Sequence, residues 1–241
     1  MDALALATIA LAFVTVLLAV ATVFGREIRG WLIRPRLRLS GGSTARYVVR
    51  TPSGWLDQMS LAPAGMPETV NVPPGETAPW YWIRMEVSNA LNNSETAQDV
   101  EIFIEEMQQR SGVEGFKTLP NVGLNLCWSW GPNTIFTDIL PGATKFFNIG
   151  HVTHPDGRKD FPDYAAVHGS LGQGQAFLTL ASFPRVPGYE AIFEPGTYRI
   201  CLLIGGKNFP TTRHWVQFEF DRVWTPQLDL MCKSLSLKIE N

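Results

Sequence analysis

An unbroken apolar run near the N-terminus constrains this chain more than any other feature. Residues Ala3–Phe24 make up 22 positions without a charged residue, a glycine or a proline. As an α-helix they would rise about 33 Å, enough to cross the hydrocarbon core of a bilayer. The run lacks the polar face that a helix on a soluble surface needs. We therefore expect residues 1–24 to form a short tail and a transmembrane helix, which contacts the lipid bilayer through residues 3–24.

A cleaved signal peptide is the alternative interpretation of this run. The triplet Ala19-Val20-Ala21 has the small-x-small form of a cleavage site. Only Met1 and Asp2 precede the run, however, so the basic segment that usually opens a signal peptide is missing. The sequence leaves open whether Ala21 is a cleavage site.

The charges that flank the run predict its orientation. Five arginines follow within 14 residues, and nothing basic except the α-amine precedes. The positive-inside rule then places the N-terminus outside and residues 25–241 in the cytoplasm of a single-pass protein of the cell membrane; a secreted or periplasmic domain is the alternative. We expect the helix to continue into a basic juxtamembrane segment, residues 25–35, and to stop at Pro35. The residues expected at the membrane interface are Arg26, Arg29, Trp31 and Arg34.

Composition limits what the remaining chain can be. Residues 39–241 carry 15 basic and 20 acidic side chains, a net charge of −5, which argues against a nucleic-acid partner. About 200 residues are enough for one self-sufficient core. Cys127, Cys201 and Cys232 are odd in number and without CxxC spacing. They therefore predict neither a zinc ribbon nor a complete disulfide framework, in keeping with a reducing cytoplasm.

Short alternating runs between Pro- and Gly-rich turns fill residues 36–241. In Tyr81–Ser88, alternation places Tyr81, Ile83, Met85 and Val87 on one face. Residues 98–110 fit either a helix or a strand, and their β-branched side chains favour a strand. The tail 228–239 is expected to dock as a last strand or to fray. Further strands are expected at 36–39, 47–50, 124–130, 138–140, 144–149, 176–183, 196–204 and 215–220.

This pattern predicts an all-β fold, an antiparallel β-sandwich with long loops at 51–79 and 151–175. The series YWIRMEVSNA, DVEIFI, LNLCWS, ILPGATKFFNIGHV, EPGTYRI and HWVQFEFDRVW resembles uncharacterised bacterial single-span membrane proteins with an immunoglobulin-like β-sandwich. The resemblance covers about residues 81–224 and implies a fold without an activity. The antibody-type core is absent, because Tyr198 lies three residues before Cys201 instead of two.

One cluster of metal-type ligands stands out. His151, His154 and Asp156 lie within six residues, and two histidines with a carboxylate can hold catalytic zinc or iron. A metal-dependent enzyme is therefore one alternative function. The cluster is expected in a loop, however, where no helix would orient both imidazoles. We accordingly expect no catalytic residue, no metal and no other cofactor.

The eight tryptophans suggest where a partner would bind. Trp128 and Trp130 share a face with leucines and are expected in the core. Trp55, Trp80 and Trp82 lie in or beside the 51–79 loop and form a candidate binding surface. The expected function is a non-catalytic, membrane-tethered protein-interaction module that contacts another protein or itself. An extracytoplasmic ligand-binding domain is the second alternative.

Overall fold

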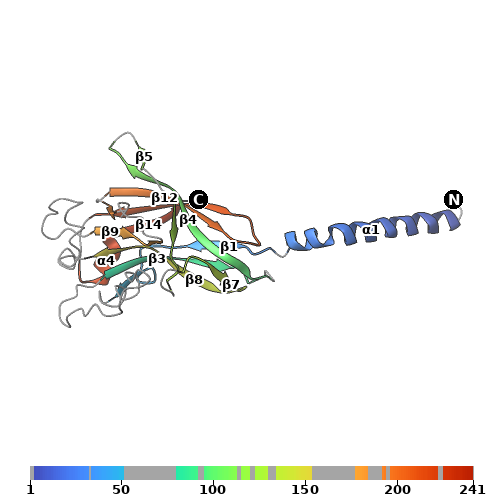
Figure 1. The fold of residues 1–241 in the computed structure, drawn as a ribbon, viewed down its shortest axis with the longest axis horizontal. Helices are drawn as coiled ribbons and strands as arrows, with labels where there is room; N and C mark the ends of the chain where they lie inside the picture. Colours follow the sequence, from blue (N-terminus) through green and yellow to red (C-terminus); the bar gives the residue numbers. More distant parts are fainter. Residues whose placement is uncertain are drawn as a thin grey trace, which may run out of the picture.

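The apolar run forms a long helix that stands apart from a β domain (Figure 1). The structure is a computed structural model, and it describes residues 3–32, 34–51, 80–91, 95–112, 115–119, 123–129, 134–153, 177–183, 192–193, 196–221 and 225–240. Helix α1 spans Ala3–Leu32, so it continues past the apolar run and ends before Pro35, as expected. Its segment Ala5–Phe24 is long and apolar enough to cross a membrane, and none of it is buried against the domain.

The rest of the described chain is mostly antiparallel β-structure. Residues 97–110 form a strand, which decides the ambiguous segment in favour of the strand. The strands are β1 (Leu37–Ser40), β2 (Val48–Thr51), β3 (Trp80–Asn89), β4 (Ala97–Arg110), β5 (Phe116–Thr118), β6 (Leu124–Leu126), β7 (Thr137–Ile139), β8 (Thr144–Thr153), β9 (Phe177–Leu180), β10 (Ser182–Phe183), β11 (Ile192–Phe193), β12 (Gly196–Gly205), β13 (Thr212–Phe220) and β14 (Leu235–Glu240). The predicted all-β class with one N-terminal apolar helix is therefore confirmed.

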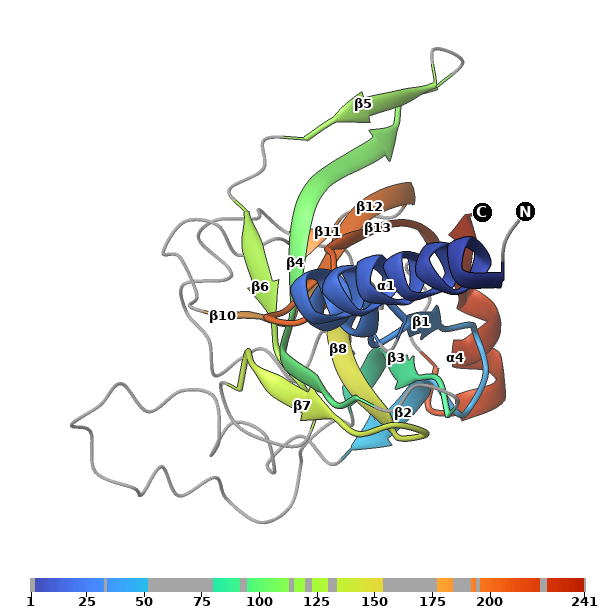
Figure 2. The ribbon, with the colours of Figure 1, turned by 90° about the vertical axis from the view of Figure 1, so that its right-hand side faces the viewer.

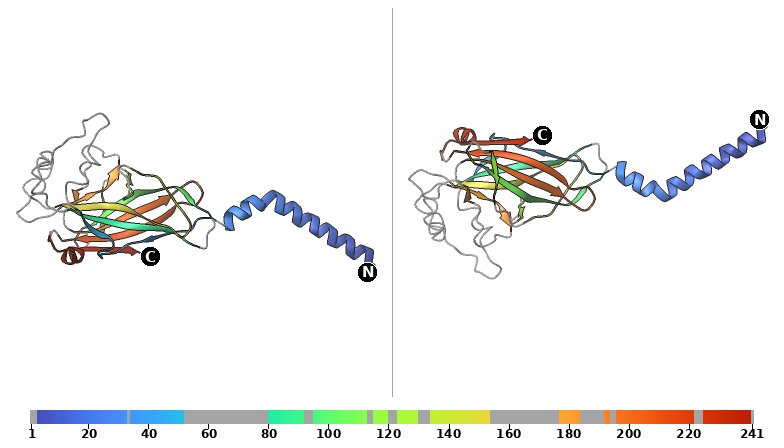
Figure 3. Two further views of the ribbon diagram at one scale, coloured as in Figure 1. Left: turned by 90° about the horizontal axis from the view of Figure 1, so that it is seen from below. Right: turned by 90° about the horizontal axis from the view of Figure 1, so that it is seen from above.

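The strands form two antiparallel sheets. The six-stranded sheet has the order β1-β3-β8-β9-β11, with β2 also paired to β3. The eight-stranded sheet has the order β10-β6-β4-β12-β13-β14, with β5 and β7 also paired to β4. Figure 3 shows both sheets running along the length of the domain, with α1 leaving from one end. Figure 2 shows β5 and the end of β4 projecting beyond the rest of their sheet.

The inward faces of both sheets meet in one hydrophobic core. Tyr81, Ile83, Met85 and Val87 of β3 are all buried, as their alternation predicts. Trp128 is buried as expected, and its indole Nε1 donates to the carbonyl oxygens of Val100 and Ile135 at 3.2 and 3.1 Å. Because the buried indole N–H has acceptors within the protein, the ring can be buried without leaving an unpaired polar group in the core.

Two chain segments pass from one sheet to the other. Leu124–Leu126 pair with β4, and three residues later Ser129 donates its backbone N–H to Phe146 of β8. Residues 177–183 make the same crossing, since β9 pairs with β8 and β10 pairs with β6. At this side of the domain the sheets are therefore joined by backbone hydrogen bonds as well as by the core.

Two expectations need correction. The tail begins with a short helix, α4 (Leu228–Ser234), that the sequence did not predict, and only Leu235–Glu240 docks as a strand. Residue 151 was expected to open a loop, but β8 continues to Thr153, because His151 pairs with Trp82 of β3 and Thr179 of β9. The three cysteines are free thiols, in agreement with the absence of a disulfide framework.

Candidate functional site

Side chains on the outer face of the six-stranded sheet form the candidate site. Because the odd-numbered residues of β3 enter the core, Trp82, Arg84 and Glu86 point outward. The register places Trp82 opposite His151 and Glu86 opposite Phe146 of β8. A shift in register between Ile83 and Arg84 accommodates one extra residue of β8. We call this row the outer strip; its members are Arg46, Tyr47, Trp82, Arg84, Glu86, Phe146 and His151.

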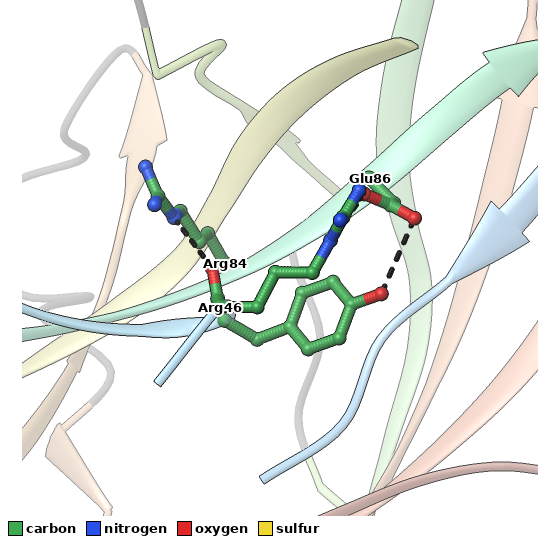
Figure 4. Close-up of polar contacts among 4 residues, drawn as sticks. Arg46, Arg84 and Glu86 are labelled. Carbon is green, nitrogen blue, oxygen red and sulfur yellow. Dashed lines mark hydrogen bonds and ion pairs between the residues drawn. The ribbon is translucent and has the colours of Figure 1, made fainter. Parts of the chain in front are cut away.

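The carboxylate of Glu86 accepts hydrogen bonds from two neighbouring side chains of the outer strip (Figure 4). Arg46 donates to Glu86 Oε2 from Nη2 at 2.5 Å and from Nε at 3.1 Å. The hydroxyl of Tyr47 donates to Glu86 Oε1 at 3.2 Å. Hydrogen bonding and the charge of Glu86 raise the pKa of Arg46, whereas burial and then the charge of Glu86 raise the pKa of Tyr47. The carboxylate is therefore committed to these two neighbours.

Arg84 differs from Arg46, because no carboxylate among the described residues pairs with it. Its Nε donates to the backbone oxygen of Arg46 at 3.3 Å, and its guanidinium points away from Glu86 (Figure 4). Burial, and then the charge of Arg46, lower the pKa of Arg84. A guanidinium stays charged even so. The strip thus holds two positive groups and one carboxylate, and the positive charge in excess is on Arg84.

The guanidinium groups of both arginines lie near the ring of Phe146. The guanidinium carbon of Arg84 lies 4.7 Å from the ring centroid, and that of Arg46 lies 5.7 Å away. Both distances allow a cation–π attraction. An aromatic ring beside a half-buried guanidinium offers a partner apolar contact and charge recognition at the same place.

Two of the residues singled out in the sequence meet at one end of the strip. The rings of Trp82 and His151 lie 4.8 Å apart with an angle of 40° between their planes. Trp82 is half-buried and His151 is buried. Trp82 was named in the candidate binding surface and His151 in the alternative metal cluster, and the structure packs the two rings together.

The structure describes the other predicted site residues only in part. Arg34 is exposed next to the end of α1. Arg26, Arg29 and Trp31 belong to α1, and Trp80 is the first residue of β3, but their side chains are not described. Trp55, His154 and Asp156 lie outside the described residues. Within the described part of the chain, no three residues of the types His, Cys, Asp or Glu come together as metal ligands.

The charged side chains of a second cluster, on the eight-stranded sheet, pair with one another. The guanidinium of Arg199 lies between the rings of Phe116 and Trp215, at 5.0 and 4.9 Å, and pairs with both carboxylate oxygens of Glu240. Cys201 donates its thiol to Glu105 at 3.2 Å. Burial and Glu105 raise the pKa of Cys201 to about 12, so this thiol is inert at neutral pH. Glu105 also pairs with Arg213 at 2.5 Å, so the two carboxylates of this cluster each have a cationic partner.

Sequence reasoning named Trp82 and His151 among the members of the outer strip and missed the other five: Arg46, Tyr47, Arg84, Glu86 and Phe146. Alternation does predict that Glu86 points outward, but its partner Arg46 lies 40 residues away, and only the strand register brings them together. Comparison with family models, curated proteins and solved structures finds no match for this chain. The function is therefore inferred from the geometry alone.

Proposed function

We propose that this chain is a membrane-tethered protein-interaction module without catalytic activity. In this proposal α1 lies in the bilayer with its N-terminus outside, and residues 25–241 lie in the cytoplasm. The apolar helix supports the tether, and the five arginines between residues 26 and 38 support the orientation. The domain is proposed to be an immunoglobulin-like β-sandwich, for which the support is two antiparallel sheets over one core.

The outer strip is the proposed recognition surface. The single observation that carries this proposal is the contrast between Arg46, which Glu86 neutralises, and Arg84, which no described carboxylate neutralises. A carboxylate from a partner would neutralise the guanidinium of Arg84 through a charge-assisted hydrogen bond, as Glu86 neutralises that of Arg46. Phe146 lies directly beside it for an apolar contact. The expected partner is a protein segment that carries an acidic side chain next to an apolar one.

A matched pair of arginine variants tests this surface. Arg84→Gln removes the charge but keeps much of the side chain, and Arg110→Gln is the control, because Arg110 is an exposed arginine over Phe116 on the other sheet. Tagged full-length chains are purified from cross-linked cells, and the proteins that accompany them are quantified by mass spectrometry. A partner retained by wild type and Arg110→Gln but lost by Arg84→Gln supports the proposal. If all three chains recover the same proteins in equal amounts, the outer strip is not the recognition surface.

Two further measurements separate the alternatives. A metal-dependent enzyme predicts stoichiometric metal in the purified chain, which His154→Ala would abolish; that result would replace the proposal. An extracytoplasmic ligand-binding domain predicts that a reporter fused after Asn241 is active only outside the cytoplasm. The proposal predicts activity of the reporter in the cytoplasm only.

A further inference from the structure

Few large apolar side chains are exposed among the described residues of the domain, and two of them lie in adjacent turns. Outside α1, the described residues expose only four: Leu91, Phe136, Leu140 and Leu230. Leu91 is 82% exposed and Leu140 is 62% exposed. Both sit in turns, Leu91 just after β3 and Leu140 between β7 and β8. Single exposed leucines need no explanation, but two on one rigid structure do.

Backbone hydrogen bonds fix these two turns against each other. Asn89 donates its N–H to the carbonyl oxygen of Ala143 at 3.0 Å, and Gly142 donates to the carbonyl oxygen of Asn89 at 2.9 Å. The side chain of Asn89, which is 1% exposed, donates from Nδ2 to the carbonyl oxygens of Glu95 and Ile139 at 2.9 and 3.0 Å. We call residues 89–91 and 139–143 the proximal platform.

Gly142 brings Leu91 close to the second turn. Its φ of +74° is a conformation that favours glycine. A Cβ added there would meet Leu91 Cδ1 at 2.7 Å. The side chain of Leu91 therefore lies directly against the turn that carries Leu140, and the two leucines belong to one surface.

The proximal platform lies at the end of the domain that faces α1. Ala90 donates its N–H to the carbonyl oxygen of Arg36, four residues after the end of the helix, at 3.2 Å. The pairing of Leu37 with Asn89 places the start of β1 beside the same turn. Figure 1 shows β1 and β7 at the helix end of the domain, whereas α4, which carries Leu230, lies at the other end. A bilayer that holds α1 is consequently the nearest surface to Leu91 and Leu140.

The charges around the platform suit a lipid headgroup region. Arg34 and Arg36 are exposed in the link to α1 and can attract anionic lipid. Among the acidic groups nearby, Asp99 pairs with Lys207 at 2.5 Å, and Asp138 accepts the backbone N–H of Asp99 at 2.9 Å. Glu95, whose backbone oxygen accepts from Asn89, has no cationic partner among the described residues, so the membrane contact is made by the two leucines and the two arginines and not by this carboxylate.

The geometry points to the proximal platform as a second membrane contact, by which Leu91 and Leu140 enter the headgroup region and set the orientation of the domain on the bilayer. This inference rests on the proposed tether. With the platform held at the membrane, the part of the outer strip formed by Arg46, Arg84 and Phe146 faces sideways, toward a partner. The platform thus restricts the directions from which a partner can approach.

Site-specific fluorescence in the full-length chain tests this contact. A dansyl-bearing amino acid replaces Leu91, Leu140 or Leu230 in separate chains, which leaves the native cysteines intact. The chains are reconstituted in vesicles of equal parts phosphatidylcholine and phosphatidylglycerol, with or without nitroxide-labelled lipid. Leu230 is the matched control, since it is an exposed leucine on α4 at the far end of the domain. Flotation of the vesicles shows separately whether the chain is tethered.

We expect blue-shifted emission and several-fold stronger quenching at positions 91 and 140 than at position 230. Chains that float but show equally weak quenching at all three positions overturn the platform contact while the tether stands. Chains that do not float overturn the tether, and the platform contact with it. Substitution of both leucines by aspartate should leave flotation unchanged but abolish the quenching of a dansyl group placed at the neighbouring Ala90; retained quenching would contradict the inference.

Discussion

Removal of the Asn89 side chain should destabilise the domain more than any exposed substitution nearby. Asn89→Ala eliminates two hydrogen bonds from Nδ2, to the carbonyl oxygens of Glu95 and Ile139. Loss of the bond to Glu95 costs about 1 kcal/mol, and the buried oxygen of Ile139, left unpaired, costs about 1–3 kcal/mol. The Ile139 bond is buried, so its oxygen cannot recover a partner from water without a rearrangement. The free energy of unfolding should therefore fall by about 2–4 kcal/mol.

Urea denaturation of the full chain in detergent micelles measures this loss. With an m-value of about 2 kcal/mol/M, the midpoint should move down by roughly 1–2 M. Thr144→Ala, at an exposed position of β8, is the control and should change the free energy of unfolding by less than about 0.5 kcal/mol. If Asn89→Ala is as mild as the control, Asn89 does not hold the two turns of the platform together.

Asn89→Asp adds a pH dependence with a definite sign. A carboxyl group at this buried position would face two carbonyl oxygens, which raises its folded-state pKa above the value in the unfolded chain. The variant should then be most stable below the unfolded pKa, near 4, and should lose stability as the pH rises through the folded-state pKa. A variant that is more stable at neutral pH than at acid pH, relative to wild type, would contradict the proposed burial of this side chain.

Two further predictions concern the core and the thiols. Trp128→Ala should lower the free energy of unfolding by about 3–5 kcal/mol, because it opens a cavity. Trp128→Phe should cost about 1–3 kcal/mol, mainly for the carbonyl oxygens of Val100 and Ile135 that lose the indole donor; a Trp128→Phe variant that melts like wild type would show that the indole bonds are absent. Cys201, whose pKa is raised to about 12, should resist maleimide at pH 8 in the folded chain and react only after denaturation; rapid labelling of folded protein, located by peptide mapping, would rule out its burial.

Strand positions and faces were predictable because the side-chain period of a strand is visible in the sequence. The buried residues of β3 and of β13 follow their alternation directly. The short helix α4 was missed because seven residues cover too few turns to separate a helical period from a strand. The end of β8 was missed for a different reason: the polar run 151–175 indicates a loop locally, while pairing with β3 and β9 on both sides keeps residues 151–153 extended.

The candidate site depends on register, which single-strand patterns do not contain. Glu86 could be predicted to face outward, but its two partners come from the segment before β2, and Phe146 comes from β8. A cluster assembled from such distant segments leaves no local motif. The proximal platform is equally non-local, because Leu91 and Leu140 are 49 positions apart in the sequence and the bonds of Asn89 hold their two turns together.

The membrane tether is tested most directly by fractionation of cells that make the full chain, with high-salt and alkaline carbonate washes of the membranes. We predict that the chain stays in the washed membrane pellet at its full mass. Leu11→Arg combined with Leu17→Arg should release it, because each arginine costs about 2.5–3.5 kcal/mol near the centre of a spanning helix; Leu11→Ile with Leu17→Ile is the matched control and should remain in the pellet. A wild-type chain found in the soluble fraction, whether intact or shortened to begin after Ala21, would contradict the tether.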